Sequence, residues 1–190
     1  KLTKKEQFYA NFIENITKKY TYREFTQLLS VEKNSEIEKI TEESLKSTGE
    51  LKLLYDIIRD KSFVAFQKGR YEEAIETIQT ELIKKNRATS IDYAILGDYY
   101  LYSKQFTKAE EAYLLGIKLN PSEINFQLNL AHVYLFTDKI SEAKTIHKKY
   151  AHESLFTGKT WTEQTKIDFE SFEKHQLPTN NFKKILRVLE

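Results

Sequence analysis

Apolar residues recur at helical spacing near both ends of the chain. Phe8, Phe12, Ile16 and Tyr20 follow one another every four residues, which places them on one face of an α-helix. The same kind of stripe recurs near the other end, at Phe182, Ile185, Leu186 and Leu189. Each stripe predicts an amphipathic helix whose apolar face packs against other helices.

Short polar patterns predict where further helices begin. A Ser or Thr followed three residues later by Glu forms a capping box, in which the two side chains satisfy the free amides of the first helical turn. Such pairs occur at Thr21 with Glu24, Ser35 with Glu38, Thr107 with Glu110 and Thr160 with Glu163. The last pair begins a segment that carries Trp161, Phe169 and Phe172, which we expect to be a capping helix.

The central part of the chain repeats with a period of 34 to 35 residues, marked by Ala74, Ala109 and Ala143. Small residues at this spacing allow two helices to approach closely. The surrounding pattern is clearest in the middle copy, where an aromatic residue, a Leu-Gly pair, a second and a third tyrosine and a proline occur in order. These residues are Tyr93, Leu96, Gly97, Tyr100, Tyr113 and Pro121.

This order of residues resembles the tetratricopeptide repeat, although Tyr93 replaces the usual tryptophan, and Lys61 and Ser62 replace the Leu-Gly pair of the first copy. The resemblance implies an all-α superhelix, or α-solenoid, of about three helix-turn-helix repeats at residues 55–89, 90–123 and 124–157. We expect turns near residues 69, 104 and 138 and no strand. Residues 1–50 and 158–190 are expected to form non-repeat helical caps.

Composition narrows the possible functions. A net charge of +2 is spread evenly along the chain, so there is no basic stripe for a nucleic-acid backbone. No apolar run approaches the roughly 20 residues that cross a bilayer. The chain has no cysteine and, even at residue 1, no methionine. We therefore expect a module of a larger or processed protein, and the sequence does not assign its compartment.

The sequence contains no recognisable catalytic motif. The four histidines are scattered, and the nearest two, His147 and His152, are five residues apart, which does not place both on one helix face. The glycines are accounted for by the repeats and their ends, so no phosphate-binding loop is left. We expect no enzymatic activity, no cofactor and no metal site.

The resemblance instead implies a binding groove on the concave side, lined by the first helix of each repeat. Carried over position by position, the groove residues are Phe63, Asp98, Leu101, Tyr102, Asn125, Asn129, His132 and Phe136. Repeats that grip the acidic tails of chaperones use a clamp of Lys, Asn and Arg. At those five positions this chain has Arg59, Phe63, Ile95, Asn125 and Asn129, so chaperone tails are not the expected partner.

A groove of aromatic and aliphatic groups with amides between them suits a protein or peptide segment. The sequence thus predicts a peptide-binding scaffold. Two alternatives remain open. The domain could be a regulatory sensor in which a bound peptide changes the curvature of the superhelix, or the groove could be filled by residues 8–20 of the same chain.

Overall fold

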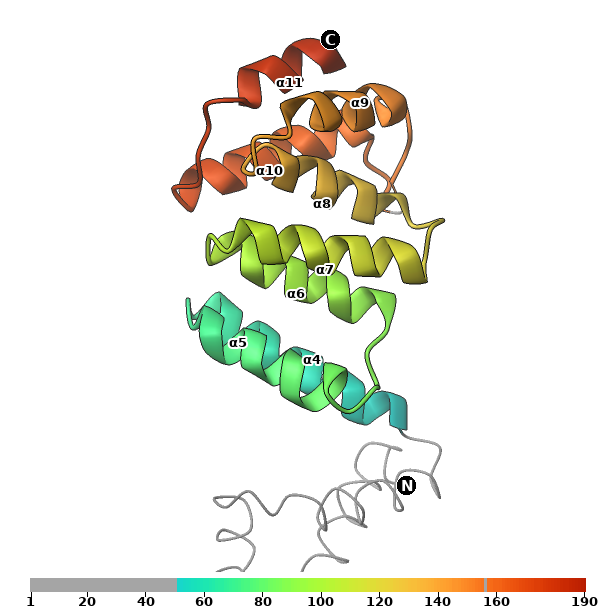
Figure 1. Cartoon of the computed structure of the whole chain (residues 1–190), viewed down its shortest axis with the longest axis vertical. Helices are drawn as coiled ribbons and strands as arrows, with labels where there is room; N and C mark the ends of the chain where they lie inside the picture. The colour runs from blue at the N-terminus through green and yellow to red at the C-terminus, as the bar shows by residue number, and fades with distance from the viewer. Residues whose placement is uncertain (1–50, 156) are drawn as a thin grey trace, which may run out of the picture. The chain divides into compact units, whose positions relative to one another are not determined.

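The computed structural model describes residues 51–155 and 157–190, and residues 58–190 form one compact unit. The expected stripe at residues 8–20 and the expected helix starts at Thr21 and Ser35 lie outside the described residues. Within the described part every regular element is a helix, apart from an isolated β-bridge between Ser154 and Thr160. The all-helical prediction is therefore confirmed (Figure 1).

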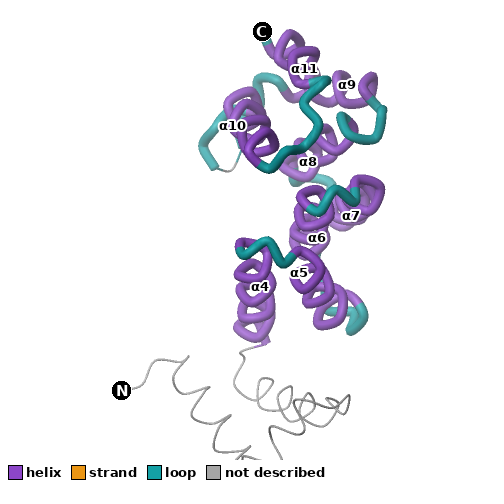
Figure 2. The backbone as a smooth tube through the Cα atoms, turned by 90° about the vertical axis from the view of Figure 1, so that its left-hand side faces the viewer, coloured by secondary structure: helices purple, strands orange, loops and turns teal. Residues whose placement is uncertain are grey.

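The helices follow one another as antiparallel pairs (Figures 1 and 2). Within each pair a short turn reverses the chain, and neighbouring pairs stack through their helices. The elements are α4 (Leu51–Gln67), α5 (Tyr71–Ile78) continued by the π-helical η1 (Gln79–Ile83), α6 (Ser90–Tyr102), α7 (Phe106–Leu119), α8 (Ile124–Tyr134), α9 (Ile140–Tyr150), α10 (Trp161–Lys174) and α11 (Phe182–Leu189).

The turn inside each of the first three pairs contains one residue with positive φ. These residues are Gly69 (φ 71°), Lys104 (φ 63°) and Asp138 (φ 58°), at the positions that the repeat pattern predicts. Only the first is a glycine, so the other two turns hold a side chain in the left-handed region that glycine adopts more easily. The helix pairs thus reverse where the sequence indicates.

Small residues lie at the contacts between helices, as the pattern predicts. Ala109, Ala131 and Ala143 are fully buried, and Gly97 lies directly against the ring of Tyr113 on the next helix. Ser62, which replaces the expected glycine of the first pair, is also fully buried. Its hydroxyl lies 3.0 Å from the hydroxyl of Tyr99. A serine therefore fits this contact because a hydrogen bond satisfies its polar atom.

The helix starts agree with the capping patterns at one place and differ at another. Thr160 and Glu163 form the predicted capping box of α10. The prediction for Thr107 and Glu110 is wrong, because α7 already begins at Phe106. The carboxylate of Glu110 instead pairs with Lys139. A capping box that sequence analysis missed opens α6, where Asp takes the place of Glu three residues after Thr89.

Helix α10 (Figure 2) packs against the first helices of the two preceding pairs, α6 and α8, and its first residue also contacts α9. Its first residue, Trp161, is completely buried in a core with Leu128, Ala131 and Leu155. Helix α11 then packs on α9 and α10. None of the described helices is long and apolar enough to span a membrane.

Candidate functional site

A cavity of about 330 Å³ opens between α4 and α6, on the surface formed by the first helix of each pair. Its walls are mostly aromatic and aliphatic, with three charged residues among them. The lining residues are Arg59, Asp60, Phe63, Phe66, Ile95, Asp98, Tyr99 and Tyr102.

The aromatic wall is one connected group of rings. Phe66 stacks on Tyr99, with ring centroids 4.8 Å apart, and meets the edge of Tyr102 at 5.4 Å. Phe63 lies one turn earlier on α4, 6.4 Å from Phe66, and half of its surface (50%) is exposed. An exposed ring beside partly and fully buried rings is available to a ligand at little cost in stability, because it already lies on a rigid support.

Asp98 supplies a carboxylate to the same cavity. Its Oδ1 atom accepts a hydrogen bond from the hydroxyl of Tyr113 at 2.5 Å and a long one from Asn129 at 3.4 Å. Burial raises the pKa of Asp98 to about 7, although the Tyr113 bond acts in the opposite direction, and the nearby carboxylate of Asp168 adds to the rise. This group therefore changes charge near neutral pH.

The cation in the cavity is already engaged by another residue. Arg59 donates from Nε and Nη2 to the two carboxylate oxygens of Asp92, at 2.7 and 2.9 Å. Burial alone would raise the pKa of Asp92. The bonds from Arg59 and Thr89 outweigh burial, so the pKa lies below its ordinary value. Arg59 and Asp92 therefore form a neutral pair, and the single cation that remains of the clamp pattern already holds a carboxylate of its own chain.

The other half of the expected groove is covered by α10. The hydroxyls of Tyr102 and Ser171 lie 2.9 Å apart, and the Tyr102 ring also contacts His175. Phe172 meets the edges of the rings of His132 and Phe136, with centroids 5.4 and 5.8 Å away. A helix of the same unit thus lies where a ligand of α8 would bind.

The eight expected groove residues are consequently divided. Phe63, Asp98 and Tyr102 line the cavity. Leu101 and His132 are only 2% and 1% exposed, so the structure does not place them at a surface that a peptide reaches. The remaining three make contacts within the unit: Asn125 bonds to Glu123, Asn129 bonds to Asp98, and Phe136 stacks on Phe106.

Phe66 and Tyr99 complete the site. In the first repeat, the resemblance to the tetratricopeptide pattern also marks Phe66, three residues after Phe63, as a concave position. It does not mark Tyr99 as one. Tyr99 is an aromatic residue that the repeat pattern does not require, directly after Asp98. An aromatic residue outside the pattern is therefore the signal that could have identified it.

Two histidines lie buried under α10. The rings of His132 and His147 are 5.5 Å apart, and Nδ1 of His147 accepts a hydrogen bond from the indole of Trp161 at 2.9 Å. That bond makes Nε2 the protonated nitrogen of His147. Asp168 approaches Nδ1 of His132 at 3.6 Å. No group of three ligands suited to a metal ion occurs among the described residues.

Burial lowers the pKa of His147 to about 4. Burial also holds the pKa of His132 well below its ordinary value, and the neighbouring His147 adds to this effect. Unfolding restores the ordinary pKa of 6.5. The unfolded chain therefore takes up the proton first as the pH falls from 6.5 towards 4, and acid favours unfolding.

We expect His147→Gln, which keeps an acceptor for Trp161, to remove the loss of stability in acid that His147 causes. The difference in unfolding free energy between the parent and the variant should shrink by about 2 kcal/mol from pH 7.5 to 4.5. Urea unfolding at both pH values measures it. Asp98 and Asp168, whose raised pKa values act with the opposite sign, are present in both proteins and cancel. A difference that does not change with pH would contradict a neutral His147.

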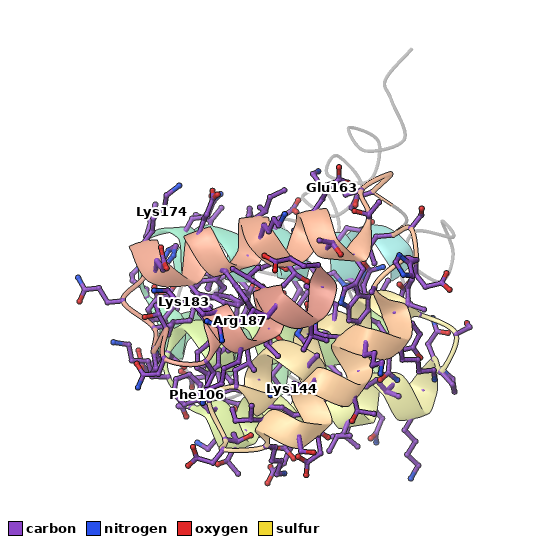
Figure 3. The ribbon with its side chains drawn as sticks, turned by 90° about the horizontal axis from the view of Figure 1, so that it is seen from above. Phe106, Lys144, Glu163, Lys174, Lys183 and Arg187 are labelled. Carbon is purple, nitrogen blue, oxygen red and sulfur yellow. The ribbon has the colours of Figure 1, made fainter. Side chains whose placement is uncertain are left out.

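A second cavity, of about 570 Å³, lies between α10 and α11. Its charged lining residues are two lysines and two glutamates, Lys166, Lys183, Glu170 and Glu173. Seen from the α11 end, Lys183 and Arg187 lie on α11 beside α10 (Figure 3). The balanced charges select no class of ligand, so the cavity between α4 and α6 is the better candidate site.

Comparison with known families places this site on a recognised element. Residues 93–123 match the family model of a tetratricopeptide repeat, and they cover most of the α6–α7 pair that supplies Ile95, Asp98, Tyr99 and Tyr102 to the cavity. Searches of curated proteins and of solved structures found no match. Repeats of this family are typically interaction scaffolds. Residues 93–123, in the α6–α7 pair, are thus an identified tetratricopeptide repeat.

Proposed function

We propose that this protein is a non-enzymatic scaffold that binds a segment of a partner protein in the cavity between α4 and α6. The observation that carries the proposal is the group of rings that faces this cavity, with Phe63 half exposed at its edge. Buried aromatic anchors supply most of the energy in peptide and protein recognition. We also infer that the pairs before and after the matched repeat are divergent repeats of the same family.

The size of the cavity fits one or two side chains of a bound segment rather than a whole helix. About 330 Å³ lies at the small end of the range for ligand sites. Because α10 covers the surface of α8, the segment would approach over α4 and α6. This arrangement supports a short anchored peptide.

Selection from a displayed library of random 12-residue peptides tests the proposal. Peptides selected on the parent protein are labelled with a fluorophore, and their affinity is measured by anisotropy. Phe63→Ser should weaken binding by about tenfold or more, because it removes an exposed anchor. Leu115→Ser is the matched control, since Leu115 is similarly exposed (45%) but lies on α7.

The control should bind like the parent, and circular dichroism should show that both variants remain folded. Equal affinity of the Phe63→Ser variant and the parent would contradict the proposed site. A selection that yields no binding peptide would contradict the proposed function itself.

The regulatory alternative is supported by one contact. Tyr102 lines the cavity and also bonds to Ser171 of α10, so a ligand that moves Tyr102 would act on α10. Hydrogen exchange of the amides of α10, with and without a selected peptide, distinguishes the two functions. A simple scaffold leaves exchange in α10 unchanged, whereas a sensor changes it.

A further inference from the structure

The charges around the α4–α6 cavity do not cancel. Arg59 is neutralised by Asp92, which has no exposed surface. Two carboxylates remain in the lining, those of Asp60 and Asp98. The cavity therefore combines aromatic walls with an excess of negative charge.

The geometry at Asp98 leaves one oxygen for a ligand. Both bonds that its carboxylate accepts, from Tyr113 and from Asn129, end on Oδ1. No side chain of the described residues donates to Oδ2. Since Asp98 lines the cavity, a donor bound there can reach this carboxylate without displacing either existing bond.

The rings beside Asp98 favour the same kind of ligand. Phe66 contacts both Tyr99 and Tyr102 at the cavity, and Ile95 adds an aliphatic wall. The face of an aromatic ring attracts a cation, most strongly where water is excluded. A carboxylate that is itself partly removed from water also prefers a charged donor to a neutral one.

We propose that the cavity recognises a cationic side chain, lysine or arginine, of the bound segment, with Asp98 as its acceptor and the rings of Phe66, Tyr99 and Tyr102 as its walls. This inference rests on the proposed function and specifies what the site selects. A segment with an acidic or apolar anchor would offer no donor to Oδ2 of Asp98, and a neutral donor would leave its charge without a counterion.

The charge of Asp98 makes this recognition dependent on pH. Its pKa of about 7 means that the carboxylate is mostly ionised at pH 8 and mostly protonated at pH 6. Affinity for a cationic segment should therefore fall by about tenfold over this interval.

Other titratable or charged groups face Asp98 from every element packed around it. They are Arg59 and Asp60 on α4, Tyr99 and Tyr102 on α6, Tyr113 on α7, Asp168 on α10 and His175 at the end of α10, while α8 contributes the neutral Asn129.

The selected 12-residue peptides provide the test. We expect lysine or arginine to be enriched at one position relative to the unselected library, and replacement of that residue by glutamine to weaken binding at least tenfold at pH 8. Asp98→Asn should weaken binding by a similar factor, because it removes the charge and keeps an acceptor for Tyr113. Glu72→Gln, an exposed carboxylate on α5, is the matched control and should bind like the parent.

The two proposals fail in different ways. Peptides that lose affinity with Phe63→Ser but show no enrichment of cations would overturn the cationic anchor and keep the binding site. The same follows if Asp98→Asn binds as tightly as the parent. It also follows if the Asp98→Asn variant keeps the tenfold fall between pH 8 and 6, because a group other than Asp98 would then cause that fall. Peptides that are insensitive to Phe63→Ser would overturn the site itself.

Discussion

Replacing Trp161 by alanine is expected to lower the free energy of unfolding by about 3–5 kcal/mol, the largest loss for any single substitution considered. The indole is completely buried, stacks on Tyr150 with centroids 5.0 Å apart, and donates to His147. Its removal leaves a large cavity where α10 meets α8 and α9. It also leaves the acceptor nitrogen of His147 without its donor.

Urea unfolding followed by circular dichroism measures this loss, because Trp161 is the only tryptophan and its fluorescence disappears with it. Trp161→Phe retains much of the buried area but loses the second ring and its N–H donor, so a smaller loss of about 1–3 kcal/mol is expected. Ile167→Ala, at an exposed position of the same helix, should stay near the parent. A Trp161→Ala protein that unfolds within 1 kcal/mol of the parent would show that this residue does not anchor α10.

Gly97→Ala is the second large effect, and its sign is opposite to the usual one. In an open helix this change stabilises by about 1 kcal/mol. Here an added Cβ would lie 2.5 Å from Cε1 of Tyr113. Tyr113 is fully buried and its hydroxyl bonds to Asp98, so the ring has no free space to enter. We expect a loss of about 3 kcal/mol, at the upper end for overpacking.

Gly116→Ala is the matched comparison in the same pair of helices. Its added Cβ would lie 3.2 Å from the carbonyl oxygen of Ser90, which calls for a shift of only a few tenths of an ångström. The gain in helix propensity should offset most of that strain, leaving a change below about 1 kcal/mol. Thermal melting of the two variants side by side checks both. Equal melting temperatures would contradict the close contact at Gly97.

Much of the fold is predictable from the sequence because it depends on local patterns. The turns at Gly69, Lys104 and Asp138 follow from the period of the repeat, and the start of α10 follows from Thr160 and Glu163. The family register also places Phe63, Asp98 and Tyr102 on helix faces that meet at one cavity. These features depend on residues within one repeat or at equivalent positions of adjacent repeats.

The position of α10 was not predictable in the same way. Its packing on Tyr102 and His132 depends on how Phe172 and Ser171 fit a surface made by helices far away in the sequence. The sequence predicts a cap for the last pair and offers residues 8–20 as a possible occupant of the groove. It does not indicate α10 as the occupant, because an amphipathic pattern shows which face is apolar and not which neighbour that face contacts.

The relation between His132 and His147 was missed for a similar reason. The two lie 15 residues apart on α8 and α9, and their proximity appears only once the two helices pair. Spacing along one helix excluded a pair formed by His147 and His152, but it says nothing about contacts between helices.

The central claim, that the cavity between α4 and α6 is the interaction site, is tested most directly by photocrosslinking. Benzoylphenylalanine replaces Phe63 in one protein and Leu115 in another, and each is irradiated with a selected peptide at equal occupancy. The account predicts a covalent adduct from position 63, suppressed by excess unlabelled peptide, and none above background from position 115. Adducts from position 115 alone, or equally from both positions, would contradict it.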